Sequence, residues 1–237
     1  MAGTGRGTAM QKTSFDLDGI AVTLYAEKRP ELLFLQPVDA HDAALLDREI
    51  AALGDVSRPF ALAAFQVSDW NRDLSPWEAP PVFGKLPFGG RAEATLAFLT
   101  DRLLPELRDR LALPESAALC LGGYSLAGLF ALWAATRTQL FSAVAAASPS
   151  VWFPGWLEEV KAHPIQAPVV YLSLGDREER TKNPLMATVG DCIRALYALL
   201  QPDHRVTLEW NEGNHFQNPE RRTARAFSWA AEEIKNG

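Results

Sequence analysis

The sequence predicts an α/β protein in which a mostly parallel sheet is covered by helices on both of its faces. Two observations predict this class. From about residue 30 to the end, short apolar runs typical of buried strands alternate with longer segments of helical spacing. Near the middle, residues 119–130 combine an apolar strand, a tight glycine-containing turn with one serine, and the start of an apolar helix. No internal repeat or linker-like composition interrupts the pattern, so we expect one domain over residues 13–237.

The first elements are a predicted hairpin and two buried strands. Polar and apolar residues alternate loosely over residues 15–26, around the turn signal Asp18-Gly19. Residues 32–35 and 60–65 are continuous apolar runs, as expected of strands covered on both faces. Between them, residues 42–53 have the spacing of a helix that ends at Gly54.

A long connection over residues 68–90 separates these strands from the next helix. Disordered segments contain few aromatic residues, and this connection is rich in them, so we expect it to pack over the carboxyl edge of the sheet. Its four prolines and four large aromatics are Pro76, Pro80, Pro81, Pro87, Trp70, Trp77, Phe83 and Phe88. Leucine and phenylalanine then recur at helical spacing over residues 91–111.

The second half of the chain continues the alternation of strands and helices. The strand and serine turn precede a predicted helix over residues 126–136, and small apolar residues predict a strand over 141–147. A strand over 169–174 and a helix over 187–200 follow. The last predicted elements are a strand over 205–210, a loop over 211–218 and a helix over 219–234. Such alternation implies right-handed crossovers between parallel strands.

Composition excludes several classes of partner. Lys and Arg number 23 against 29 Asp and Glu, a formal charge of −6, and no basic run exceeds a pair, so we expect neither nucleic acid nor membrane as a partner. Cys120 and Cys192 lack metal-site or disulfide spacing, and we expect no metal and no cofactor. Residues 1–12 lack the apolar core of a signal peptide and are expected to be a disordered leader, which favours a cytoplasmic location. The sequence is silent on oligomeric state.

Ser125 is the candidate nucleophile. It lies in Gly123-Tyr124-Ser125-Leu126-Ala127, a small-residue variant of the nucleophile elbow Gly-x-Ser-x-Gly. The turn holds the serine in a sparsely populated backbone conformation, so the residues two before and two after it must be small. The hydroxyl then projects above the sheet, and the Leu126 N–H points to where an oxyanion could form.

The ends of the predicted strands supply the partners that such a serine needs. Catalytic groups of open α/β sheets lie at the carboxyl ends of strands. His215 follows the last strand, whereas the other three histidines lie in or near helices or before that strand. Glu178 is the expected acid, and Asp176, two residues earlier, is the alternative. Serine, acid and histidine in this order are typical of the α/β-hydrolase fold, here without a large cap domain.

Oxyanion stabilisation needs a second N–H donor, which we expect in the turn after residue 35. Pro37 has no N–H, so Val38 or Asp39 is the candidate. Three tryptophans on loops at the same edge are candidates for a substrate wall: Trp70, Trp77 and Trp152. Lys85, Arg91 and Arg72 could meet an anionic acyl group, or be simply solvated.

Four segments resemble the putative esterase family of α/β hydrolases, which includes esterase D-type and enterochelin (siderophore) esterases. The resemblance spans about residues 30–235 and implies a single-domain member, since the separate N-terminal domain of enterochelin esterases is missing. In siderophore esterases the acid follows a Gly-x-x-acid pattern, which carries onto Glu178. One departure is Ala127, where many members have Gly. The segments are Gly122-Gly123-Tyr124-Ser125-Leu126-Ala127-Gly128-Leu129, Ala147-Ser148-Pro149-Ser150-Val151-Trp152, Gly175-Asp176-Arg177-Glu178 and Gly213-Asn214-His215-Phe216.

The sequence therefore predicts a serine hydrolase that cleaves a small-molecule carboxylic ester through an acyl-Ser125 intermediate. The resemblance implies a siderophore-type ester or a small aromatic or acyl ester as substrate. Two alternatives stay open at this point: an acyltransferase on the same fold, and a non-catalytic descendant that binds a ligand.

Overall fold

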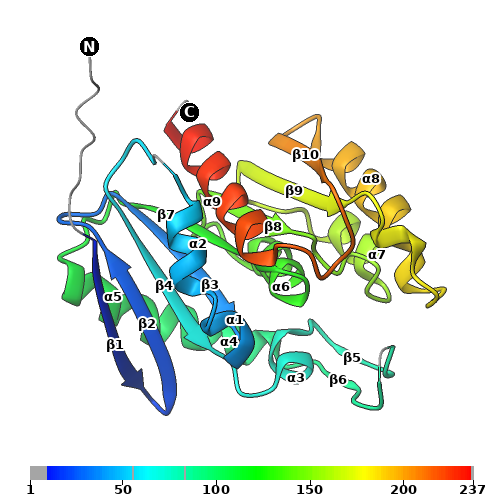
Figure 1. Ribbon diagram of the computed structural model, residues 1–237, viewed down its shortest axis with the longest axis horizontal. Coiled ribbons are helices and arrows are strands. Elements are labelled where there is room, and N and C mark those ends of the chain that lie inside the picture. Colours follow the sequence, from blue (N-terminus) through cyan, green and yellow to red (C-terminus); the bar gives the residue numbers. More distant parts are fainter. Residues whose placement is uncertain (1–9, 55, 83, 236–237) are drawn as a thin grey trace.

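The computed structural model describes residues 10–54, 56–82 and 84–235. Its centre is an eight-stranded sheet in the order β1-β2-β4-β3-β7-β8-β9-β10 (Figure 1). The six strands from β4 to β10 in this order run parallel to one another, whereas β2 is antiparallel to both β1 and β4. The predicted, mostly parallel α/β sheet is thus confirmed. Its strands are β1 (Gln11–Leu17), β2 (Ile20–Ala26), β3 (Leu32–Val38), β4 (Phe60–Gln66), β7 (Ala118–Tyr124), β8 (Ala143–Ala147), β9 (Val169–Gly175) and β10 (Arg205–Asn211).

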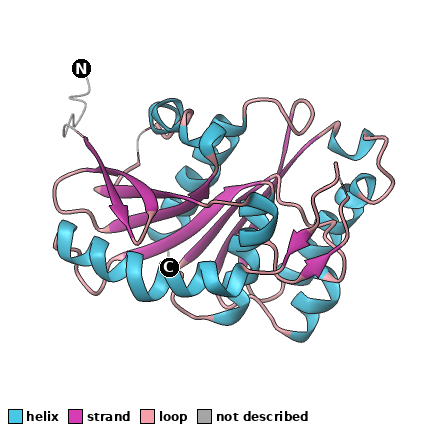
Figure 2. Ribbon diagram, turned by 90° about the horizontal axis from the view of Figure 1, so that it is seen from below, coloured by secondary structure: helices cyan, strands magenta, loops and turns pink. Residues whose placement is uncertain are grey.

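Helices cover both faces of the sheet (Figure 2). Alternate side chains of a strand point to opposite faces, and β3 shows the division. Leu33 and Leu35 belong to the core beneath α4 (Ala92–Phe98), α5 (Leu104–Leu111), α6 (Leu126–Arg137) and α8 (Val189–Leu200). Leu32 and Phe34 belong to the core beneath α2 (Leu46–Ala52) and α9 (Pro219–Lys235), where the rings of Phe34 and Phe227 lie 4.7 Å apart.

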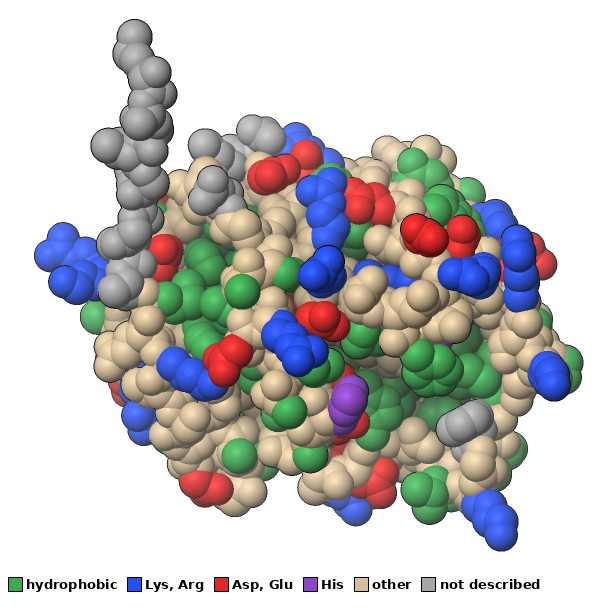
Figure 3. Space-filling model, in the orientation of Figure 1, with side chains coloured by type: hydrophobic (Ala, Val, Ile, Leu, Met, Phe, Trp, Pro, Cys, Tyr) green, Lys and Arg blue, Asp and Glu red, His purple; other side chains and the backbone are tan. Residues whose placement is uncertain are grey.

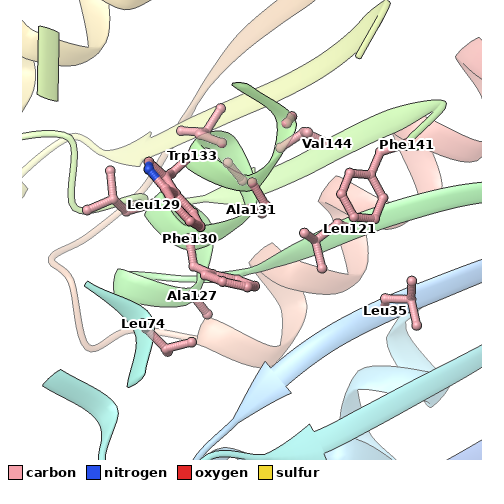
Figure 4. Packing of buried hydrophobic residues seen from close by; sticks show 14 of the residues in the cluster. Leu35, Leu74, Leu121, Ala127, Leu129, Phe130, Ala131, Trp133, Phe141 and Val144 are labelled. Atoms are coloured by element: carbon pink, nitrogen blue, oxygen red, sulfur yellow. The ribbon is translucent and has the colours of Figure 1, made fainter. Parts of the chain in front are cut away.

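Helix α6 is apolar on all sides, as predicted. Every residue from Leu126 to Thr136 is buried. Figure 4 shows Phe130 and Trp133 projecting from this helix among side chains from neighbouring elements, including Leu74 and Leu121. A helix with no polar face gains its stability from such packing, so α6 gives the preceding serine turn a rigid support.

Two predicted helices differ from the structure in detail. The helix expected over residues 42–53 is divided into α1 (Ala40–Ala43), which Asp39 caps, and α2. The helix expected over 91–111 contains a π-helical turn at Leu99–Leu103, which ends two residues before Pro105. Proline lacks an N–H and its ring clashes with the carbonyl four residues earlier, which accounts for the altered hydrogen bonding there.

Between β8 and β9 lies α7 (Trp156–Ala162), a helix that is not predicted from the sequence. It begins after Gly155, whose φ of +81° suits glycine. With seven residues, α7 is too short to show a clear helical period.

The long connection over residues 68–90 is ordered by its aromatic residues. It contains α3 (Trp70–Leu74) and the short paired strands β5 (Glu78–Ala79) and β6 (Phe88–Gly89). Trp77 and Phe88 contact the ring of Phe153 with centroid separations of 5.6 and 5.0 Å. Because Phe153 follows β8, the connection packs at the carboxyl edge of the sheet, as expected; Phe83 lies outside the described residues.

At the amino-terminal end, β1 starts at Gln11, two residues before the expected boundary at 13. The rest of the expected leader, residues 1–9, lies outside the described residues. Among the described helices, none is both long and apolar enough to cross a membrane.

Glu49 is a buried acid on α2, with 3% of its surface exposed. Its Oε2 accepts a hydrogen bond of 3.2 Å from Gln36 Nε2. Burial, with a smaller contribution from the charge of Asp42, raises the pKa of Glu49 to about 8. The folded protein therefore holds this proton to a higher pH than the unfolded chain does.

Stability is expected to fall as the pH rises through the window from about 4.5 to about 8, because over that range the folded state binds the Glu49 proton and the unfolded state releases it. Glu49→Gln keeps an oxygen acceptor for Gln36 and cannot ionise. The free energy of unfolding can be measured with urea at pH 5 and at pH 9. Between these two pH values, the wild type should lose on the order of 3 kcal/mol more of this free energy than Glu49→Gln does. Equal losses of unfolding free energy in the two proteins would contradict a raised pKa of Glu49.

Candidate active site

Ser125 lies in the turn between β7 and α6 with φ of 57° and ψ of −120°. Non-glycine residues rarely adopt this conformation, which costs of order 1–3 kcal/mol. The turn also requires small neighbours. A Cβ added to Gly123 would lie 2.6 Å from the Ala127 Cβ, so the Ala found at position 127 fits only because position 123 is glycine.

Backbone hydrogen bonds fix the serine turn from both sides. The Ser125 N–H donates to the Ala147 carbonyl at 3.1 Å, and the Ser125 carbonyl accepts from the N–H groups of Leu129 and Ser150. Leu126 is the first residue of α6. Its N–H belongs to the first turn, where helical N–H groups have no partner within the helix, so it is free to face a bound anion.

His215 lies in the loop between β10 and α9, within reach of the serine. Its Nε2 is 2.9 Å from Ser125 Oγ. The Tyr124 hydroxyl donates to the His215 carbonyl at 2.8 Å. Burial, followed by the nearby charge of Glu178, raises the pKa of Tyr124 to about 12, so this hydroxyl keeps its proton at neutral pH.

Glu178, the expected acid, is the carboxylate in contact with the histidine. His215 Nδ1 is 2.7 Å from Glu178 Oε2. The alternative acid, Asp176, accepts a hydrogen bond of 2.8 Å from the Gly213 N–H, and its side chain is 55% exposed. Asp176 therefore braces the loop that carries His215, while Glu178 contacts the imidazole.

The second oxygen of Glu178 has three donors. Ser148 Oγ donates to Oε1 at 2.7 Å, the Gly175 N–H at 2.8 Å and Arg222 Nη1 at 2.9 Å. Burial by itself would raise the pKa of Glu178. The hydrogen bond and charge of His215, with the hydrogen bonds from Ser148 and the Gly175 N–H, outweigh it and hold the pKa below the ordinary value.

Arg222 is not predicted from the sequence, and Ser148 has no predicted role. Arg222 lies on α9 beside Arg221, and nothing in a helical sequence shows which of two adjacent arginines points inward. Ser148 gave a weak signal through its position at the end of β8. Its backbone has a positive φ of 43°, which is uncommon for serine.

A cavity of about 440 Å³ opens beside His215 and Glu178. Figure 3 shows, on this face of the molecule, a hollow lined with hydrophobic side chains and a histidine at its edge. Its walls combine apolar groups with three exposed cations. The apolar residues include Trp152, Met186, Val189 and Phe216, and the cations are Arg177, Arg180 and Lys182.

Of the three tryptophans expected to form a substrate wall, Trp152 lines this cavity. Trp77 does not, because its Nε1–H donates to the Pro154 carbonyl at 3.0 Å and its ring packs on Phe153. Trp70 is half-buried against the core and is also outside the lining. Arg72, one of the cations named from the sequence, pairs instead with Asp73 at 2.8 Å.

Val38 and Asp39, the candidates for the second oxyanion donor, lie at the end of β3, next to β7 in the sheet. The carboxyl ends of these parallel strands meet at one edge, and Ser125 follows β7 at that edge. The Val38 side chain is buried in the core, and Asp39 caps α1 by accepting the Asp42 N–H.

Within the described residues, no group of three or more His, Cys, Asp and Glu side chains is placed to hold a metal ion. The site brings a hydroxyl, an imidazole and a buried carboxylate into one hydrogen-bonded chain. In that arrangement the imidazole can take the hydroxyl proton while the carboxylate orients the ring and stabilises the imidazolium that forms.

Comparisons with known proteins identify a family and a shared fold. A family model described as "Putative esterase" matches residues 58–197, more than half of the chain. No curated protein matches the sequence.

Three solved structures illustrate the shared fold. The siderophore hydrolase EstB from Aspergillus nidulans is 20% identical, with a TM-score of 0.72 over 98% of this chain and 97% of that one. An IroE-like serine hydrolase from Shewanella oneidensis is 16% identical, with a TM-score of 0.76 over 95% of this chain and 81% of that one. The enterobactin and salmochelin hydrolase IroE is 18% identical, with a TM-score of 0.59 over 96% of this chain and 95% of that one.

The strain at Ser125 predicts an unusual stability effect. Glycine adopts the observed backbone angles without strain. The free energy of unfolding of Ser125→Gly should therefore be about 1 kcal/mol larger than that of Ser125→Ala. The same two variants at Ser142, which has no positive φ, should rank in the opposite order. Urea unfolding of the four proteins provides the measurement, and a Ser125→Gly variant less stable than Ser125→Ala would show that the turn is unstrained.

Proposed function

Because the chain belongs to the putative esterase family and is therefore an ester-hydrolysing enzyme, we propose that Ser125, His215 and Glu178 are its catalytic triad. The observation that carries the proposal is the continuous hydrogen-bonded chain from Ser125 Oγ through His215 to Glu178 Oε2. A serine hydroxyl becomes a good nucleophile only when a neighbouring base removes its proton, and His215 Nε2 is the group in position to do so.

The proposed reaction has two stages. His215 takes the Ser125 proton as Oγ attacks the ester carbonyl, and the N–H groups of Leu126 and Val38 stabilise the oxyanion. Asp39 is the alternative to Val38. The tetrahedral intermediate collapses, the alcohol leaves with the proton from His215, and the acyl group stays on Ser125. Water, activated by His215, then releases the acid and restores the serine.

Solvent access favours hydrolysis over acyl transfer. The His215 side chain is 24% exposed, and the cations around the cavity are exposed. Water can therefore reach the acyl-serine, whereas an acyltransferase must keep water away from that intermediate.

We propose an aromatic or siderophore-type ester with an anionic group as the substrate. The apolar lining, with Trp152 and Phe216, suits an aromatic ring, and Arg177, Arg180 and Lys182 supply positive charge beside it. Solved structures of the same fold carry the names siderophore hydrolase and enterobactin and salmochelin hydrolase. The net charge of −6 makes a cationic cavity notable, because the protein as a whole does not attract anions.

The cytoplasm remains the proposed location. Cys120 and Cys192 are both free thiols in the structure, as is usual for proteins of reducing compartments.

Three substitutions test the triad. Ser125→Ala should abolish hydrolysis of 4-nitrophenyl acetate and labelling by a fluorophosphonate probe. Glu178→Gln should lower kcat/KM by about 10³-fold or more. Asp176→Asn is the matched control and should cost less than about 10-fold, because Asp176 does not contact the imidazole. Full activity of Ser125→Ala would refute the nucleophile, and a larger loss in Asp176→Asn than in Glu178→Gln would reassign the acid.

The cationic wall predicts charge selectivity. Arg180→Ala/Lys182→Ala should lower kcat/KM for mono-4-nitrophenyl succinate about 3- to 10-fold at low salt, and leave that for uncharged 4-nitrophenyl butyrate unchanged. A control variant, Lys28→Ala/Lys161→Ala, removes two exposed charges that do not line the cavity. Equal effects of both double variants on the succinate ester would show that only net charge matters.

A further inference from the structure

Arg222 is buried beside the proposed triad. It lies on α9, and its side chain is 4% exposed. Nη1 donates to Glu178 Oε1 at 2.9 Å and lies 3.1 Å from the Tyr124 hydroxyl and 3.3 Å from Ser148 Oγ. Nη2 donates to the Glu212 carbonyl at 3.1 Å. One guanidinium therefore contacts the acid, the residue before the nucleophile and the loop that carries His215.

Stability alone is a poor reason for this arrangement. Removing both charges of an ion pair from water costs free energy that their attraction often fails to recover, and apolar replacements are frequently as stable. The Glu178 side chain is also only 4% exposed. A buried pair at this location is better explained by what it does for the neighbouring imidazole.

The donors around Glu178 are divided between its two oxygens. Arg222, Ser148 and the Gly175 N–H all donate to Oε1, and His215 Nδ1 contacts Oε2. This division prevents rotation of the carboxylate and leaves Oε2 aimed at the imidazole. A Cβ on Gly175 would lie 3.0 Å from both Arg222 Nη1 and Glu178 Oε1, so glycine is required where the groups meet.

Arg222 also holds the loop of His215. The Tyr124 hydroxyl, which lies within hydrogen-bond distance of Arg222, donates to the His215 carbonyl at 2.8 Å. The bond to the Glu212 carbonyl fixes the start of the same loop. The guanidinium thus positions His215 through two backbone carbonyls, that of Glu212 directly and that of His215 through Tyr124. It also positions Glu178 through Oε1.

Charge is the second consequence of this contact. A carboxylate next to an imidazole favours the protonated ring, which cannot accept the serine proton. The positive charge of Arg222, in contact with Glu178, offsets that carboxylate. We propose that Arg222 is a positioning residue of the triad, which fixes Glu178 and neutralises its charge so that His215 can act as a base near neutral pH. This inference rests on the proposed function.

Other charged groups near the imidazole are few in the described part of the chain. Tyr124 packs against it, with the ring centroids 5.1 Å apart and the ring planes tilted by 40°, and keeps its proton. Asp42, on α1, is close enough for His215 to influence its pKa, which burial raises to about 6. Arg177 lines the same cavity and pairs loosely with Asp176 at 3.8 Å. Arg222 is the cation among these groups that contacts the triad acid.

The test is the pH dependence of kcat/KM for 4-nitrophenyl acetate between pH 5 and pH 9, whose acidic limb reports the free enzyme's catalytic base. Arg222→Met leaves Glu178 unneutralised, so the His215–Glu178 pair should hold its proton more tightly and the limb should move about one unit to higher pH. Arg222→Lys keeps the charge and should keep the limb in place while lowering kcat. Arg221→Met, on the exposed neighbour, is the matched control and should leave the profile unchanged.

A merely structural role would lower activity by the same factor at every pH, and an unshifted limb in Arg222→Met would overturn the proposal. Circular dichroism checks folding; if Arg222→Met does not fold, Arg222→Gln, whose amide can still donate to Glu178, makes the same comparison. Ser125→Ala is assayed in parallel. An inactive Ser125→Ala with an unshifted Arg222→Met limb rejects the role of Arg222 alone, whereas an active Ser125→Ala rejects the triad itself.

Discussion

The buried carboxylate of Glu178 is the group on which the rest of the site depends. Both of its oxygens are hydrogen-bonded: Oε2 contacts His215 and Oε1 accepts from Arg222, Ser148 and the Gly175 N–H. These donors come from the ends of β8 and β9, from α9 and from the loop after β10. A carboxylate buried without such donors would take up a proton rather than stay charged. The site therefore requires that these separate elements meet within hydrogen-bond distance.

Two features of the site cost stability and are supported by the surrounding fold. Ser125 holds a positive φ, and the Glu178–Arg222 pair is removed from water. Strained and charged groups persist only where the surrounding structure over-determines them. Here α6 is buried along nearly its whole length behind the serine, and α9 packs Phe227 against Phe34 in β3. A well-packed sheet with helices on both faces gives the turn and the ion pair little freedom to relax.

The cavity beside the proposed triad combines an apolar wall with positive charge, although the protein as a whole is acidic. Low-dielectric walls make nearby cations more effective in selecting ligands. This combination is the basis for the proposed substrate, an ester with both a ring and a negative charge. The cations lie on the segment between β9 and α8, which also carries Glu178, so the fold places the acid and the positive charge side by side.

The sequence by itself determined the serine turn, the histidine after the last strand and, apart from short elements such as α7, the order of strands and helices. Apolar periodicity and the small residues around Ser125 are local signals. It also favoured Glu178 over Asp176, but only the structure shows Asp176 bracing Gly213 while Glu178 contacts His215. Arg222 and the cationic wall could not be predicted, and Trp77 was expected at a wall that it does not line. Which face of a helix is buried, and which loop side chains converge on one cavity, depends on contacts between residues far apart in the chain. Only the tertiary structure decides those contacts.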